Sequence, residues 1–204
     1  MRNAGNATGA GRRARTIPAL LLVLALPLAL RCGGTNEVTE VIAERPVFTS
    51  TSTAEAPDLV RLSGGEGLRS DQIQIEVSIG GPTTSSDIFA INFDIVFSDP
   101  TLVSRLSSAI GDVFTVSSDP LVPPPITVVG AVIGDRVNVG VTKCIPDTGE
   151  GVDAAGATIV TIVFTTNHAG STSLWLENGV ALDSTGAAIG SIVFDDGEAT
   201  ITQP

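Results

Sequence analysis

The chain of 204 residues carries 22 acidic side chains and 11 basic ones, which gives a formal charge of −11 and a pI near 4.3. Nucleic-acid binding needs a basic surface that neutralises phosphates, so this composition argues against that class of function. The 22 glycines and 12 prolines make up about 17% of the chain without a Gly-X-Y period, which excludes low-complexity and collagen-like chains. We therefore expect one folded domain.

The N-terminus contains an apolar run, residues 17–30, flanked by arginines on both sides. A basic start followed by an apolar run of this length predicts a secretory signal peptide over residues 1–32. The run is too short for a membrane span, which needs about 20 residues. Cys32 and the two glycines after it resemble a bacterial lipoprotein signal. The sequence leaves two possibilities open, lipidation of Cys32 or plain cleavage nearby, and both predict a secreted or cell-envelope protein.

Residues 33–57 are polar and include a Ser/Thr cluster over 49–53. Such a segment buries too little apolar surface to offset the entropy of ordering, so it predicts a flexible tether. The alternative is an additional edge strand, for which four apolar residues provide the signal: Val41, Ile42, Val47 and Phe48.

From residue 58 onward, β-branched and polar residues alternate, and turn residues interrupt the runs every 8–15 positions. This pattern predicts an all-β domain over 58–204, a nine-stranded sandwich of the jelly-roll or immunoglobulin-like type. The predicted strands are 58–63, 71–79, 88–97, 126–133, 136–142, 157–165, 171–177, 188–194 and 198–202.

One helical signal interrupts the strands. Asp99 suits a helix N-cap and Pro100 the first helical position, and three apolar residues follow at four-residue spacing, Leu102, Leu106 and Ile110. We expect one short helical turn after Asp99-Pro100.

Three stretches together resemble a cohesin domain. Residues 92–100 (NFDIVFSDP) resemble the end of an early core strand, residues 156–164 resemble a Gly-initiated strand that ends in Phe, and residues 170–186 resemble a hairpin into an Asp-x-x-Gly turn. The resemblance covers roughly residues 58–203. It implies a nine-stranded jelly-roll sandwich, related in fold to carbohydrate-binding modules.

Cohesins bind dockerins, calcium-loaded modules of glycan-degrading enzymes, through one flat sheet face and its neighbouring loops. The resemblance therefore implies a non-catalytic protein-binding module with a link to polysaccharide degradation. Ca²⁺ would enter only through the partner, and we expect no cofactor or metal in this chain. The family's outward Asn and Asp of the binding strand match Asn92 and Asp94, and Glu177 and Asn178 match its contacting loop. Alternation along 88–97 independently turns Asn92 and Asp94 outward. The alternative is that these residues form only the solvated face of a strand.

Trp175 suggests a second function, direct carbohydrate binding. Leu174 and Leu176 share one strand face, so inward leucines would expose the Trp175 ring as a stacking platform. A structural role in the cell envelope is the third hypothesis.

The sequence provides no catalytic constellation. The single histidine, His168, lies in a predicted turn, where polar residues are expected without catalysis. Acids gather in the Gly-rich stretch 147–153, but without the order of a calcium-binding EF loop. We therefore expect a protein that is not an enzyme. Cys144 is expected to be unpaired, with a bond to Cys32 as the alternative.

Overall fold

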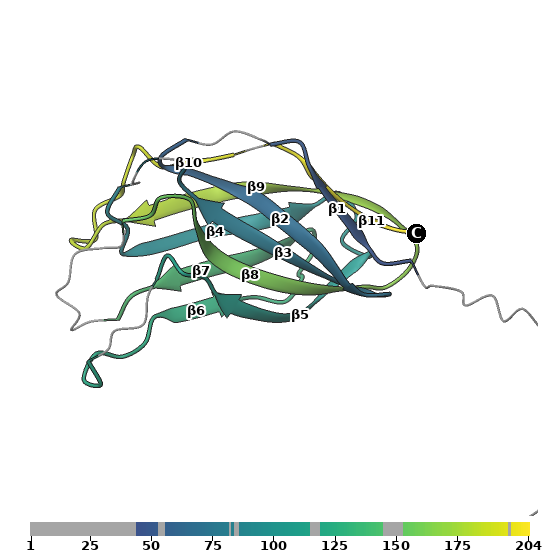
Figure 1. Cartoon of the computed structure of the whole chain (residues 1–204), viewed down its shortest axis with the longest axis horizontal. Coiled ribbons are helices and arrows are strands. Elements are labelled where there is room, and N and C mark those ends of the chain that lie inside the picture. The colour runs from purple at the N-terminus through teal and green to yellow at the C-terminus, as the bar shows by residue number, and fades with distance from the viewer. Residues whose placement is uncertain are drawn as a thin grey trace, which may run out of the picture. The chain divides into compact units, whose positions relative to one another are not determined.

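The computed structural model describes residues 44–52, 56–81, 83, 86–114, 119–144, 153–195 and 197–204. These residues form eleven strands and no helix, and so none that could span a membrane (Figure 1). The predicted signal peptide, Cys32 and most of the predicted tether lie outside this part of the chain.

The strands form two sheets that pack face to face as a sandwich (Figure 1). The first sheet has six strands in the order β1 (Val47–Ser50), β11 (Ala199–Gln203), β9 (Gly170–Leu182), β4 (Ala90–Phe97), β7 (Arg136–Thr142) and β6 (Ile126–Val129). The second has five, β10 (Val193–Phe194), β2 (Leu59–Arg69), β3 (Gln72–Ile79), β8 (Ala157–Thr166) and β5 (Val103–Ile110). The prediction of an all-β sandwich is confirmed.

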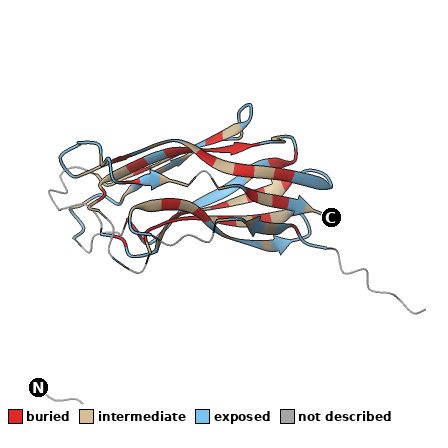
Figure 2. Ribbon diagram, turned by 90° about the horizontal axis from the view of Figure 1, so that it is seen from above, coloured by how far each residue is buried: buried red, intermediate tan, exposed pale blue. Residues whose placement is uncertain are grey.

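The core lies between the sheets because alternate residues of each strand point inward. Buried and more exposed residues alternate along most strands, as Figure 2 shows. In β4, Phe93 and Phe97 are fully buried, as the alternation predicted. The ring of Phe97 packs edge-on against Phe164 of the opposite sheet, with centroids 5.5 Å apart. Strand β4 is therefore the central core strand that its pattern indicated.

Strand β1 corrects the prediction of a tether over 33–57 at residues 47–50, where the structure instead forms the alternative, an additional edge strand. This strand pairs antiparallel with β11 of the first sheet and also lies against β2 of the second. The glycines of β2 make room for it. Phe48 occupies the space that a Cβ on Gly65 would need, and Arg45 donates from Nη1 to the Gly67 carbonyl at 3.2 Å. The segment 45–50, hereafter the N-terminal strap, thus closes one edge of the sandwich.

Strand β5 corrects the predicted helical turn. One hydrogen-bonded turn forms at Asp99, whose carboxylate accepts from the Thr101 backbone N–H at 3.0 Å, but a strand follows it directly. The four-residue spacing was misleading because a register shift between Arg105 and Ser107 leaves Leu106 in a bulge, 54% exposed. Leu102 is buried, whereas Leu106 faces solvent, so they share no helical stripe.

Replacing Phe48 with alanine should lower the free energy of unfolding by about 2 kcal/mol, since its half-buried ring packs on the core. Urea unfolding of the purified protein measures this. Val47→Ala is the matched control, because Val47 is a neighbour in the same strand but is 54% exposed. Equal stability of Phe48→Ala and wild type would show that the N-terminal strap does not belong to the cooperative fold.

Candidate functional site

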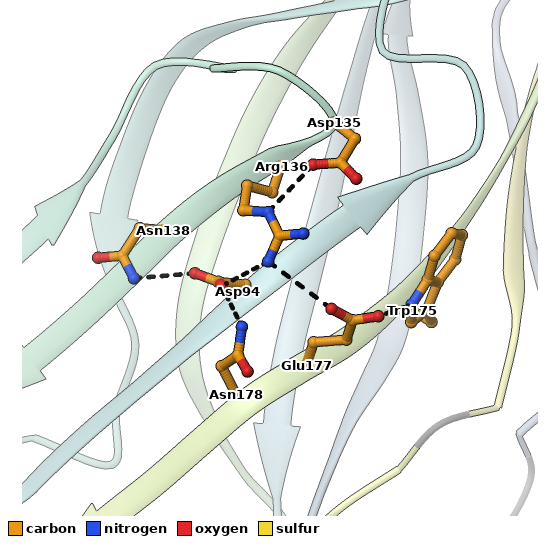
Figure 3. Close-up of polar contacts among 7 residues, drawn as sticks. All are labelled: Asp94, Asp135, Arg136, Asn138, Trp175, Glu177 and Asn178. Atoms are coloured by element: carbon orange, nitrogen blue, oxygen red, sulfur yellow. Dashed lines mark hydrogen bonds and ion pairs between the residues drawn. The ribbon is translucent and has the colours of Figure 1, made fainter.

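A polar cluster lies on the outer face of the first sheet, with Asp94 of β4 at its centre (Figure 3). Asp94 Oδ1 accepts a hydrogen bond from Asn138 Nδ2 of β7 at 2.9 Å. Its Oδ2 accepts from Asn178 Nδ2 of β9 at 2.8 Å and from Arg136 Nη1 of β7 at 3.2 Å. Three donors from two neighbouring strands therefore fix the carboxylate.

Sheet register explains this convergence. Asp94 lies directly opposite Asn138 on one side and opposite Glu177 on the other. Directly opposed side chains of an antiparallel pair have Cβ atoms about 5 Å apart, close enough for hydrogen bonds. Asp94 points outward as predicted, yet it is only 7% exposed because these neighbours cover it. Asp94 is therefore not solvated, and its role in partner binding stays a prediction.

A β-bulge brings Asn178 to the cluster. Between the pairs Asp94–Glu177 and Asn92–Val180, β9 has two residues where β4 has one. Asn178 takes a left-handed conformation with φ of 53°, which asparagine tolerates better than most residues. At Gly179 a Cβ would overlap the Phe194 ring, so only glycine fits there. The bulge thus depends on the Asn-Gly pair.

Arg136 is shared among three carboxylates. Besides Asp94, it contacts Asp135 at 3.0 Å and Glu177 at 3.7 Å. Glu177 also accepts a hydrogen bond from Trp175 Nε1 at 2.8 Å. We call Asp94, Asp135, Arg136, Asn138, Trp175, Glu177 and Asn178 the Asp94 cluster. Because it holds three carboxylates and one guanidinium, it has an excess of negative charge.

The Asp94 carboxylate should contribute to stability in a pH-dependent way. Burial alone would raise its pKa, but hydrogen bonds from Asn178, Asn138 and Arg136, with the charge of Arg136, outweigh burial and lower the pKa. A folded-state pKa below the unfolded value of about 3.9 means that the ionised group stabilises the fold above that pH. This contribution is lost as the pH falls through the folded pKa.

We therefore expect Asp94→Asn to be less stable than wild type at neutral pH, with a difference that shrinks as the pH falls below about 3.9, the unfolded pKa, and through the lowered folded pKa. Chemical unfolding at a series of pH values measures this difference. Parallel stability curves for the two proteins would contradict the prediction.

Three of the four residues predicted from the family resemblance come together, Asp94, Glu177 and Asn178. Asn92 is exposed on the same face but takes part in none of the hydrogen bonds that define the Asp94 cluster. It lines a shallow groove beside the cluster. Arg136 and Asn138 were not predicted as site residues. In the predicted strand 136–142 they alternate with valines that are buried, so they point outward. What the sequence does not show is that this strand lies beside β4.

Trp175 only partly fits its prediction. Leu174 and Leu176 are buried, so the leucines point inward and the Trp175 ring lies on the outer face. The ring is half-buried rather than free, and its Nε1–H is already bound to Glu177. Opposite it on β4, Val96 is almost fully buried.

The structure does not assemble a catalytic pair around His168. This residue is exposed, with Nε2 3.3 Å from Thr101 Oγ1 and Nδ1 2.9 Å from the Ala169 carbonyl. The Thr101 hydroxyl donates to Asp99 at 2.6 Å, so its proton is not directed at the imidazole. A base that activates a hydroxyl must accept that proton.

Metal-type clusters of three or more His, Cys, Asp or Glu side chains do not occur among the described residues. The Gly-rich acidic stretch lies outside them over residues 145–152. Cys144 forms no disulfide within the described chain, and its Sγ lies 3.3 Å from the Pro124 carbonyl.

Solved structures similar to this one are cohesin modules. The second type II cohesin of the cellulosomal adaptor ScaA scaffoldin of Acetivibrio cellulolyticus is 13% identical with a TM-score of 0.51, over 79% of this chain and 98% of that module. The sixth cohesin of scaffoldin B of the same organism, solved with a Cel5 dockerin, is 13% identical with a TM-score of 0.49, over 70% and 94% of the two chains. A non-cellulosomal cohesin of the archaeon Archaeoglobus fulgidus is 15% identical with a TM-score of 0.43, over 67% and 83%.

No protein-family model matches the sequence, and neither does any curated protein. At such low identities the likeness is one of fold. The described domain has a cohesin-like fold, a two-sheet β-sandwich.

Proposed function

We propose that this protein is an exported, non-catalytic recognition module that binds a protein partner through the outer face of its first sheet. The Asp94 cluster is the observation that carries the proposal. Its side chains are held by hydrogen bonds before any partner arrives, so binding would cost little side-chain entropy. Glu177 and Asn178 remain accessible at its surface.

The cohesin-like fold supports a partner of the dockerin type, a calcium-loaded module, and with it a link to polysaccharide degradation. Fold alone does not define function, so the face has to be tested directly. Export through the segment 1–32, with lipidation of Cys32 as an additional anchor, would place the domain outside the cytoplasm. Any Ca²⁺ requirement would then reside in the partner.

The test is a pull-down of the source organism's secreted proteins with the purified protein, with and without Ca²⁺. We expect Ca²⁺-dependent capture of a protein with duplicated Asp-rich loops. Asn92→Arg should abolish capture, because Asn92 lies exposed in the centre of the face. Ser107→Arg on β5 is the matched control on the other sheet, also exposed, and should bind as wild type does. An empty eluate, or unchanged capture by Asn92→Arg, would refute the proposal.

Direct carbohydrate binding is the second candidate, favoured by the half-exposed Trp175 ring beside the Glu177 carboxylate. Aromatic rings with one polar edge are suited to such recognition. We expect Trp175→Ala to abolish retention on insoluble glycans if this candidate is correct. If neither Asn92→Arg nor Trp175→Ala changes binding, a structural role in the cell envelope is favoured.

A further inference from the structure

A cleft of about 280 Å³ lies at the end of the first sheet where β4 begins and β9 ends. Ala90 lies at its centre, between its register partners Thr142 of β7 and Leu182 of β9. Phe89, just before β4, and the turn 184–186 line the remaining sides. The cleft adjoins the shallow groove that Asn92 lines, and its lining is distinct from the Asp94 cluster.

Phe89 differs from every other phenylalanine of the chain. All seven phenylalanines lie in the described part, and six of them belong to the hydrophobic core or pack against it. Phe89 does neither, and its half-buried side chain lines the cleft. An aromatic ring that is kept out of the core and set in a concave site is a stacking surface for a ligand.

The cleft is rigid before any ligand arrives. The Phe89 backbone N–H donates to the Leu182 carbonyl at 2.8 Å, which fixes the start of β4 against β9. On the other side, Asp183 Oδ1 accepts from the backbone N–H groups of Thr185 at 2.8 Å and Ala187 at 2.9 Å, which fixes the turn. Binding in a preformed site costs little ordering entropy.

Two threonine hydroxyls of the cleft can act toward a ligand only as acceptors. Thr142 Oγ1 donates its proton to the Lys143 carbonyl at 2.9 Å, and Thr185 Oγ1 donates its proton to Asp183 Oδ1 at 2.7 Å. A hydroxyl has one proton and two lone pairs, so each oxygen can still accept a hydrogen bond. A ligand that uses both threonines must therefore carry hydrogen-bond donors.

The lining also indicates that the ligand is neutral. None of the described residues that line the cleft is charged, although the chain as a whole has a formal charge of −11. A charged ligand would find no ion-pair partner in this lining, and the acidic chain would repel an anion. Apolar side chains of Phe89, Ala90 and Leu182 lie beside the hydroxyls. A pyranose ring matches this combination, because it has an apolar C–H face and a rim of hydroxyl donors.

We propose that the cleft binds one pyranose unit of a neutral glycan, whose C–H face stacks on the Phe89 ring and whose hydroxyls donate to Thr142 and Thr185. The site is additional to the partner-binding face and to the Trp175 candidate. Trp175 lies opposite Val96, six residues along β4 from Ala90 and therefore about 20 Å away. Pockets for drug-sized ligands measure about 300–1,000 Å³, so a cleft of about 280 Å³ fits a single sugar ring.

The test is a titration of the ¹⁵N-labelled protein with the methyl glycosides of glucose, galactose, mannose and xylose, followed by amide shifts. We expect saturable shift changes at Phe89, Ala90 and Thr142 and in the turn 184–186 for at least one glycoside, with a Kd of about 1 mM, as befits so small a ligand. Methyl glucuronide, which carries a carboxylate, and glycerol, which has hydroxyls but no ring face, are the matched controls. Both should leave these amides unchanged.

Four protein variants assign the contacts. Phe89→Ala should weaken glycoside binding at least about tenfold, whereas Phe89→Trp, which keeps an aromatic face, should retain it. Thr142→Val should weaken binding about fivefold, because it removes one acceptor at nearly constant shape. Trp175→Ala should bind the glycosides as wild type does. Dispersed amide spectra verify that each variant is folded.

Three results would overturn the inference. The first is the absence of saturable shifts in the cleft with any of the four glycosides up to about 50 mM. The second is unchanged binding by Phe89→Ala, or loss of binding in Trp175→Ala with shifts confined to its surroundings. The third is saturation of the cleft by the peptide analogue N-acetylprolinamide but by none of the glycosides, which would assign the cleft to a peptide. The partner-capture test with Asn92→Arg does not depend on these results.

Discussion

Replacing Asp94 with alanine should lower the free energy of unfolding by about 3 kcal/mol. The substitution removes the single acceptor shared by the amides of Asn138 and Asn178 and by the Arg136 guanidinium. Hydrogen bonds to a charged group contribute about 1.5–3 kcal/mol each to stability. Arg136 is 38% exposed and Asn138 and Asn178 are exposed, so all three donors regain water, and the expected loss is well below the sum of the three bonds. Urea unfolding at neutral pH measures the change.

Asn92→Ala is the matched control for this prediction. Asn92 lies on the same strand and the same face, two residues away, but it is exposed. Its removal should change stability by no more than about 0.5 kcal/mol. Equal stability losses in the two variants would mean that the Asp94 cluster contributes nothing special to the fold.

A comparable loss, about 3 kcal/mol, is expected for Gly111→Ala at the end of β5. The added Cβ would overlap the carbonyl group of Thr158, which is backbone and is unable to rotate away. The segment is fixed against β8 by hydrogen bonds from Gly111 N to the Ile159 carbonyl at 2.9 Å and from Val113 N to the Thr158 carbonyl at 3.0 Å. Relief of the overlap therefore requires separation of the two strands.

Thermal unfolding should show this loss as a decrease in Tm of about 6–12 °C. Gly190→Ala serves as the control, because a Cβ at Gly190 meets nothing within 4 Å. That variant should keep its Tm or gain slightly, since alanine restricts the unfolded chain. A normal Tm for Gly111→Ala would show that β5 and β8 are less closely packed than described.

Most of the fold was predictable because period-two alternation marks each strand that has one buried face. Nine of the eleven strands among the described residues have a predicted counterpart. β1 was predicted only as the alternative to a tether, because four residues in a Ser/Thr-rich segment are too few to show a clear alternation. β1 is stabilised by its pairing with β11, about 150 positions away, and by the packing of Phe48 over Gly65. β5 was misassigned because its bulge at Leu106 imitates helical spacing.

The candidate site was predictable only in part. Alternation correctly turned Asp94 outward, and the family resemblance selected Glu177 and Asn178. The burial of Asp94 depends on which strands lie beside β4 and on their register. Alternation along one strand predicts neither. Asn178 reaches the Asp94 cluster because β9 has a bulge opposite Phe93, and alternation alone does not predict the position of that bulge. Site geometry of this kind arises from pairing between distant strands, so it requires the structure.

The antiparallel pairing of β1 with β11 determines how the domain would respond to mechanical tension. Val47, where the chain enters β1, lies opposite Thr202, close to the C-terminal Pro204, so both chain ends leave the sheet at the same end. Force applied between them would separate the pairs one at a time from Val47 onward, rather than shear all of them together. β1 would peel away at low force and lengthen the connection, while the central strands that carry the outer face stay folded.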